Sequence, residues 1–147
     1  MNEMPSLIDV HHHIVPKEYV ESLSKQGVKK GLGVQLPNWS LDKTLEIMDQ
    51  NNIDMSVLSI SAPGVYFKDK DPALQFARDL SRRMNDLFAD LVVRHPDRFG
   101  AFATLPLPHV EASIGELRYA LDELKLDGVV LFSNYDGYYL GDPRFDK

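Results

Sequence analysis

Cysteine is absent from this 147-residue chain, and its absence excludes several kinds of chemistry. Without thiols the protein has no disulfide framework, no thiolate nucleophile and no thiolate metal ligand. Any bound metal ion must therefore be held by nitrogen and oxygen. The chain also lacks the basic and then apolar pattern of a secretory signal at its N-terminus, so we expect a cytoplasmic protein.

Excess positive charge and long apolar runs are absent as well. The chain has 16 Lys and Arg against 22 Asp and Glu, which gives a net charge of −6 and a pI near 5.3. A net-acidic body does not attract nucleic acids or anionic membranes. No stretch approaches the ~20 apolar residues of a membrane-spanning helix. We therefore predict neither a nucleic-acid partner nor a membrane partner.

The length and composition of the chain indicate one globular domain. A chain of 147 residues can bury a substantial core, and its 44% hydrophobic and 26% charged residues are ordinary for a globular protein. We expect a single domain over residues 1–147.

Segments typical of strands and helices alternate along the chain. Apolar runs bounded by turn residues predict strands at 6–11, 55–60, 99–105 and 127–132. Helical patterns occur at 17–25, at 41–51 after an N-capping Ser40, from Asp71-Pro72 to about residue 95, and at 110–124. The remaining residues of 17–39 are expected to be irregular, and residues 61–70 and 133–147 are expected to form loops. Such alternation predicts an α/β fold with a parallel sheet and right-handed crossovers.

Two architectures fit this alternation, an open doubly wound sheet and half of an eight-stranded barrel. A dinucleotide-binding sheet carries a glycine-rich turn after its first strand. Residues 11–16 of this chain read HHHIVP instead. We therefore favour TIM-barrel-type (βα) repeats with about four strands.

The strongest functional signal is the run of histidines at 11–13, directly after the apolar segment LIDV. Successive strand side chains point to opposite faces, so His11 and His13 are expected to share a face with Asp9, while His12 faces the other way. Two imidazoles about 7 Å apart along a strand can converge on one ion. His11 and His13 are the predicted metal ligands, and Asp9 is expected to orient a ring. The alternatives are a tag remnant, which the position inside the chain disfavours, and a surface polar cluster.

Three further residues are candidates for a substrate pocket. Ser59 and Asn134 stand at the ends of the second and fourth predicted strands, where each could equally satisfy a turn. Trp39 is the only tryptophan and could form a pocket wall or pack in the core. The Arg82–Arg83 pair is most simply a solvated helix face.

The histidine motif and several later segments together resemble a known family. Residues 8–16, IDVHHHIVP, are similar to the opening strand of the amidohydrolase superfamily, in its amidohydrolase-related or aminocarboxymuconate semialdehyde decarboxylase-like branch. Further segments match in order: IDMSVLS at 53–59, PDRFG at 96–100, ATLPL at 103–107, GVVL at 128–131, and Asn134 followed by GDP at 141–143. The resemblance covers nearly the whole chain, and the first motif is its most specific part.

This resemblance implies a distorted TIM barrel with a metal at the carboxyl ends of its strands. His11 and His13 match the two first-strand ligands of the family. The family completes its site with histidines of the fifth and sixth strands and an aspartate of the eighth, and the chain stops after the fourth. The implied cofactor is a divalent metal, zinc first and manganese as the alternative.

The resemblance also implies a small carboxylated substrate and two reaction types, C–N or C–O hydrolysis and non-oxidative decarboxylation. The first hypothesis is a metal-dependent hydrolase or decarboxylase, truncated relative to the family, that acts with a missing C-terminal half or as a homo-oligomer. The second is a non-catalytic half-barrel remnant or binding subunit that forms a homodimer. Exposed sheet edges favour association in either case.

Overall fold

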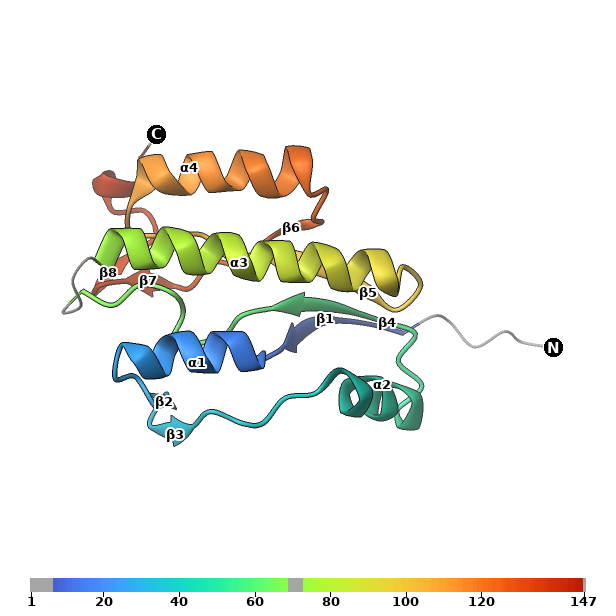
Figure 1. The fold of residues 1–147 in the computed structure, drawn as a ribbon. Helices are drawn as coiled ribbons and strands as arrows, with labels where there is room; N and C mark the ends of the chain where they lie inside the picture. The colour runs from blue at the N-terminus through green and yellow to red at the C-terminus, as the bar shows by residue number, and fades with distance from the viewer. Residues whose placement is uncertain (1–6, 69–72, 147) are drawn as a thin grey trace.

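Four parallel strands form the main sheet of the computed structural model, which describes residues 7–68 and 73–146. The strands are β1 (Ile8–His13), β4 (Met55–Ser59), β5 (Phe99–Ala103) and β6 (Gly128–Val129). Their order in the sheet is β1-β4-β5-β6, so sequence order and spatial order agree (Figure 1). The predicted α/β fold with about four parallel strands is confirmed.

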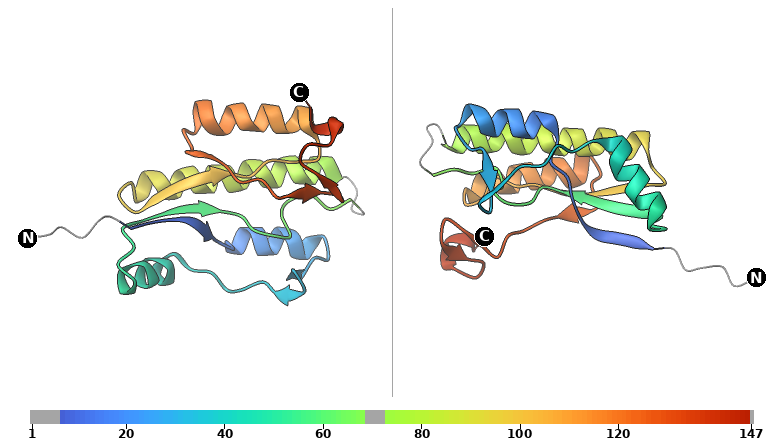
Figure 2. Two further views of the ribbon diagram at one scale, coloured as in Figure 1. Left: turned by 180° about the vertical axis from the view of Figure 1, so that it is seen from behind. Right: turned by 90° about the horizontal axis from the view of Figure 1, so that it is seen from below.

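Helices cover one face of this sheet. They are α1 (Lys17–Lys25), α2 (Leu41–Gln50), α3 (Ala73–Arg94) and α4 (Val110–Arg118). Helices α1, α3 and α4 lie together on one side of the strands, and within residues 7–68 and 73–146 no helix covers the other side (Figure 2). In the same described ranges, no helix is both long enough and apolar enough to cross a lipid bilayer.

The core lies between the sheet and these helices. Helix α3 contributes one stripe of buried side chains at helical spacing, and the strands supply residues that face it. Burying each large apolar side chain contributes roughly 1.5–3 kcal/mol. The main members are Leu58, Phe99, Leu80, Met84, Phe88 and Leu91.

A β-bulge in β1 changes which side chains share a face. Asp9 pairs with Ser56 and His12 pairs with Leu58, so three steps along β1 correspond to two steps along β4. The extra residue brings Asp9 and His12 to the same face. The prediction that Asp9 shares a face with His11 and His13 is therefore wrong, because strict alternation does not survive a bulge.

Several predicted boundaries differ from the observed ones. The first strand continues to His13 instead of ending at His11, and the fourth is only two residues long. The helix predicted at 110–124 changes after Arg118 into a π-helix, Tyr119–Glu123. The predicted helix start at Asp71-Pro72 lies outside the described residues.

Two short hairpins replace predicted irregular segments or loops. One joins β2 (Lys30–Gly31) to β3 (Val34–Gln35), and the other joins β7 (Asn134–Tyr135) to β8 (Tyr138–Tyr139). A 3₁₀ turn, Pro143–Phe145, follows the second hairpin. Strands of two residues carry too few positions to show a period of two, which is why the sequence pattern does not reveal them.

A buried polar cluster joins α3, α4 and the end of β5. The Asn85 amide donates to the Thr104 carbonyl at 3.0 Å and to Glu116 Oε1 at 2.8 Å, and its Oδ1 accepts from the Thr104 amide. Arg82 pairs with the buried Glu116 at 2.9 Å, and Arg83 donates to Ser22. Arg82 and Arg83 are both exposed, in agreement with the predicted solvated helix face, and their guanidinium groups also connect α3 to α4 and α1.

Gly100 of β5 offers a test of the close packing on the uncovered face. A Cβ at this position would lie 2.6 Å from Asp127 Oδ2, which accepts a hydrogen bond from the Ala101 amide. We expect Gly100→Ala to lower the free energy of unfolding by about 1–3 kcal/mol, as overpacking does. Urea denaturation of the wild type and of Gly100→Ala measures this change in the free energy of unfolding. Gly115→Ala in α4 is the control: it meets nothing within 4 Å and should stabilise by about 0.5–1 kcal/mol. Equal effects of the two substitutions would contradict this account.

Candidate metal centre

His11 and His13 converge on each other at the end of β1. Their Nε2 atoms lie 3.0 Å apart, and their ring centroids are 4.6 Å apart with the planes at 72°. The register of β1 shifts between Asp9 and His12, so His11 lies within the bulge and His13 follows it; the contact between their rings shows that the two side chains still meet on one side of the strand. The structure thus brings together the two residues that were predicted as metal ligands.

Ser59, the last residue of β4, holds the other side of the His13 ring. Its Oγ lies 2.8 Å from His13 Nδ1, and the two residues are partners in the parallel register. Burial lowers the pKa of His13 below its ordinary value, and the charge of His11 lowers it further. His13 is therefore biased toward the neutral imidazole, which is the form that binds metals.

Asp9 and His12 form a separate pair beside these ligands. Asp9 Oδ2 lies 3.1 Å from His12 Nδ1, and Asp9 Oδ1 accepts from the His11 amide at 3.0 Å. The hydrogen bond from the His11 amide is the main cause that holds the pKa of Asp9 below its ordinary value. Asp9 fixes the backbone before the ligands and orients His12, not His11 or His13.

The His11–His13 pair suits a divalent ion but is an incomplete site. Two imidazole nitrogens 3.0 Å apart can both reach an ion at a metal–nitrogen distance of about 2.0–2.1 Å. Between residues 7 and 68 and between 73 and 146, no group of three or more His, Asp or Glu side chains is arranged to hold a metal. A catalytic zinc commonly has three protein ligands. Two histidines are thus part of a site.

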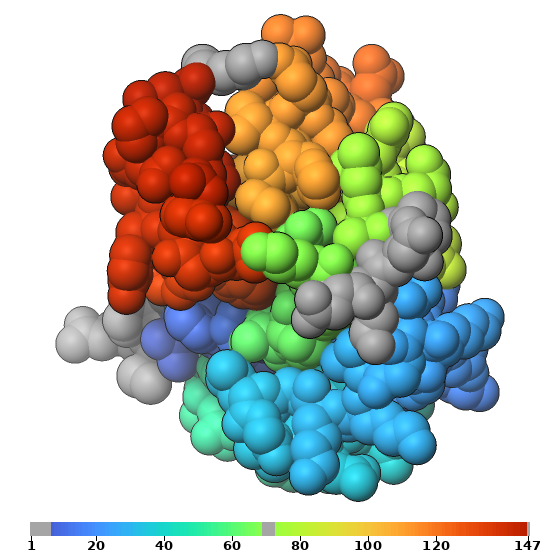
Figure 3. Space-filling view, turned by 90° about the vertical axis from the view of Figure 1, so that its left-hand side faces the viewer, coloured from blue at the N-terminus to red at the C-terminus, as the bar shows by residue number. Residues whose placement is uncertain are grey.

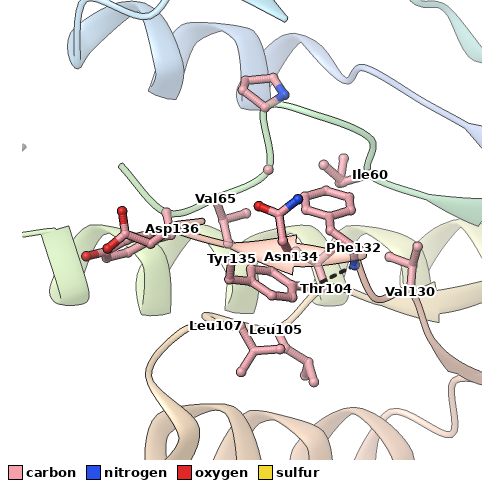
Figure 4. A pocket seen from close by; sticks show the side chains of 13 residues that line it. Ile60, Val65, Thr104, Leu105, Leu107, Val130, Phe132, Asn134, Tyr135 and Asp136 are labelled. Atoms are coloured by element: carbon pink, nitrogen blue, oxygen red, sulfur yellow. Dashed lines mark hydrogen bonds between the residues drawn. The ribbon is translucent and has the colours of Figure 1, made fainter. Parts of the chain in front are cut away.

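A pocket of about 120 Å³ opens at the carboxyl ends of β4, β5 and β6. Ile60 and Val65 follow β4, Leu105 and Leu107 follow β5, and Asn134 belongs to the β7–β8 hairpin; all five line it (Figure 4). The same segments meet in the space-filling view, in which the C-terminal part of the chain lies beside the loop after β4 (Figure 3).

The C-terminal segment supplies the polar side of the pocket. Tyr135 stacks on Phe132, with centroids 5.6 Å apart, and its hydroxyl accepts from the Phe132 amide at 3.0 Å. Asp136 also lines the pocket and pairs with Lys68 at 2.9 Å. No sequence signal marked these residues, since their positions depend on a hairpin too short to have a pattern.

The structure places the three predicted pocket residues in different surroundings. Asn134 lines the pocket, Ser59 contacts His13, and Trp39 packs partly buried against the core cluster. Contact of any of the three with a substrate stays a prediction. The bond from Ser59 to His13 spans 46 positions of the sequence, which no local pattern reveals.

Comparison with known protein families identifies the family whose sequence pattern contains these histidines. The amidohydrolase family model matches residues 8–147, which begin with β1 and its histidines. The chain belongs to the amidohydrolase family. The resemblance inferred from the first strand and the later motifs is confirmed.

Relatives of this amidohydrolase include decarboxylases. The 6-methylsalicylic acid decarboxylase acuB of Aspergillus aculeatus is 39% identical over 141 residues, which are 94% of this chain and 42% of that protein. The chain therefore spans less than half the length of such curated relatives.

Solved structures agree with the fold. A crystal structure of an amidohydrolase II matches with a TM-score of 0.86 at 33% identity, over 96% of this amidohydrolase and 45% of that chain. A second match is the dihydroxybenzoic acid decarboxylase of Polaromonas sp. JS666, solved with bound manganese and the inhibitor 2-nitroresorcinol. It has a TM-score of 0.66 at 25% identity, over 86% of this chain and 38% of that chain. Relatives of this chain thus carry a divalent metal, and manganese is the one identified.

Tyr19 of α1 anchors the loop that walls the pocket, and its hydroxyl provides a pH-dependent test. It donates to the Gly64 carbonyl at 2.7 Å, and burial raises its pKa. Above about pH 10 the unfolded chain loses this proton while the folded chain keeps it, so stability must fall as pH rises. We expect Tyr19→Phe to cost about 1 kcal/mol at pH 7 and to remove part of this alkaline decline.

Urea unfolding at pH 7, 9 and 11 measures both effects. Tyr66→Phe is the matched control, since Tyr66 also lines the pocket and its hydroxyl has no hydrogen bond within the described residues. A Tyr19→Phe protein with the same alkaline decline as the wild type would refute the assignment.

Proposed function

We propose that this chain is the N-terminal, metal-binding half of a metal-dependent decarboxylase that acts on small carboxylated aromatic compounds. The observation that carries the proposal is the convergence of His11 and His13 Nε2 at the end of β1, in a chain of the amidohydrolase family. The decarboxylase names of its relatives favour decarboxylation over hydrolysis.

In such a reaction the bond between the ring and its carboxyl group breaks, carbon dioxide leaves, and a proton takes its place on the ring carbon. A bound divalent ion supplies Lewis-acid stabilisation of charge on substrate oxygens. His11 and His13 would bind that ion through Nε2. Zinc is the ion expected from the sequence, and the manganese of the Polaromonas relative supports manganese as the alternative.

The pocket beside the strand ends suits an aromatic ring. Its volume of about 120 Å³ is close to the ~150 Å³ of an apolar cavity that holds benzene. Ile60, Val65, Leu105 and Leu107 give it apolar walls, and the Asn134 amide lies at its edge as a hydrogen-bonding group (Figure 4). Asn134 is the residue that we propose to contact a polar substituent of the ring, with Ser59 and Trp39 as lesser candidates.

A chimera tests the activity, because the described residues hold only part of the ligand set. This chain would replace the homologous 42% of the Aspergillus aculeatus decarboxylase. We expect the manganese- or zinc-loaded chimera to release carbon dioxide from 6-methylsalicylate or 2,6-dihydroxybenzoate, and His11→Ala or His13→Ala to lower kcat/KM at least ~100-fold. The control is His95→Ala, outside the metal pair. A folded, metal-loaded chimera without activity, or an active His11→Ala/His13→Ala double variant, would refute the proposal.

We infer a second role, self-association of the chain when it stands alone. β1 forms an edge of the sheet, and its side chains Ile8 and Val10 are 51% and 62% exposed. Exposed apolar edges pair with other chains. This observation supports the alternative in which the half barrel forms a non-catalytic homodimer.

Light scattering after size-exclusion chromatography tests the association. We expect a mass near twice the 16.7 kDa of one chain. Val10→Lys should shift the mass toward one chain, because a charged side chain on the edge opposes pairing. Val93→Lys on α3 is the control, since Val93 is 78% exposed but lies away from the edge. A wild-type monomer, or equal shifts for both variants, would contradict the role.

A further inference from the structure

The Ser59 hydroxyl occupies the only position from which a side chain holds His13 Nδ1 among the described residues. Ser59 is 2% exposed, and its Oγ lies 2.8 Å from Nδ1. The same Oγ lies 3.5 Å from the His12 carbonyl oxygen, to which it can donate. Both contacts are direct consequences of the parallel register of β1 and β4.

The hydroxyl has one proton, so its two contacts constrain each other. If Ser59 donates to the His12 carbonyl, its lone pair accepts a hydrogen bond from His13, which must then be the Nδ1–H tautomer. The His12 carbonyl can only accept, so in this arrangement both the carbonyl and His13 Nδ1 have Ser59 as a hydrogen-bond partner. If Ser59 instead donates to Nδ1, His13 carries its proton on Nε2, the atom that faces His11.

Metal binding distinguishes these two arrangements. An imidazole binds an ion through the nitrogen that lacks a proton, and its other N–H commonly donates to a neighbouring acceptor that fixes the tautomer. Only the first arrangement leaves His13 Nε2 without a proton at the point where it meets His11 Nε2, 3.0 Å away.

We propose that Ser59 is a positioning residue that fixes His13 as the Nδ1–H tautomer and so presents Nε2 to the metal before the metal arrives. Ser59 acts through His13, by accepting a hydrogen bond from its Nδ1–H while donating to the His12 carbonyl. The expected effect of Ser59 on metal affinity rests on the proposed metal-binding function. The tautomer itself is a property of the metal-free chain.

Ser56 provides a matched control on the same strand. It is also a buried serine of β4, at 0% exposed, and its hydroxyl has no hydrogen-bond partner among the described residues. Ser59→Ala and Ser56→Ala therefore remove the same atom from the same strand. Only the first deprives His13 Nδ1 of its acceptor.

Long-range ¹H–¹⁵N spectra of the metal-free 147-residue chain test the tautomer, at about pH 8.5 where an ordinary imidazole is neutral. We expect His13 to carry its proton on Nδ1 in the wild type and in Ser56→Ala, and to shift toward Nε2–H in Ser59→Ala. A wild-type His13 that carries its proton on Nε2 overturns the proposal, even where Ser59→Ala fails to fold. So does a His13 tautomer that is identical in all three proteins.

Titration with Zn²⁺, followed by calorimetry, tests the consequence. We expect Ser59→Ala to weaken Zn²⁺ binding by about 10–100-fold, the usual effect of losing a residue that orients a metal-bound histidine, and Ser56→Ala to leave it unchanged. Equal affinities of wild type and Ser59→Ala overturn the role in binding. A wild-type chain that binds no Zn²⁺ or Mn²⁺ refutes the proposed function instead, while the tautomer spectra still decide the role of Ser59.

Discussion

The parallel pairing of β1 with β4 is the constraint on which the candidate site depends. Its register places His13 beside Ser59, and its bulge places Asp9 beside His12. One inserted residue thus divides four polar side chains into two pairs with different roles. The pair nearer the strand end leaves the His13 Nε2 atom facing His11, and the other pair fixes the backbone that leads to them.

The balance of burial and hydrogen bonding explains why this arrangement holds. Partial burial disfavours the charged form of His13 and lowers its pKa, and Ser59 supplies a hydrogen-bond partner for its Nδ1 atom. Ser59 does so without adding charge. A carboxylate in its place would favour the imidazolium, which repels a cation and cannot coordinate one. A hydroxyl therefore suits a ligand that must stay neutral.

The two-histidine pair and the open edge of the sheet both involve β1. One face of the sheet has no helix over it in the described part of the chain, and β1 lies at the sheet's edge. In a closed barrel the same edge and face would be internal, and the remaining ligands would come from strands on the far side. The exposed apolar side chains of β1 and the two-histidine pair thus lie on surfaces that a closed barrel would make internal.

The sequence by itself determined the strand–helix alternation, the barrel-type class and the family, and it selected His11 and His13 as the predicted metal ligands, because long apolar periodicity and a compact motif are local properties. It could not determine the bulge, which shifts Asp9 to His12, nor the β7–β8 hairpin that brings Asn134 and Tyr135 to the pocket. These features depend on hydrogen bonds between strands. The link from Ser59 to His13 joins residues 46 positions apart, so only the tertiary structure could decide that it exists.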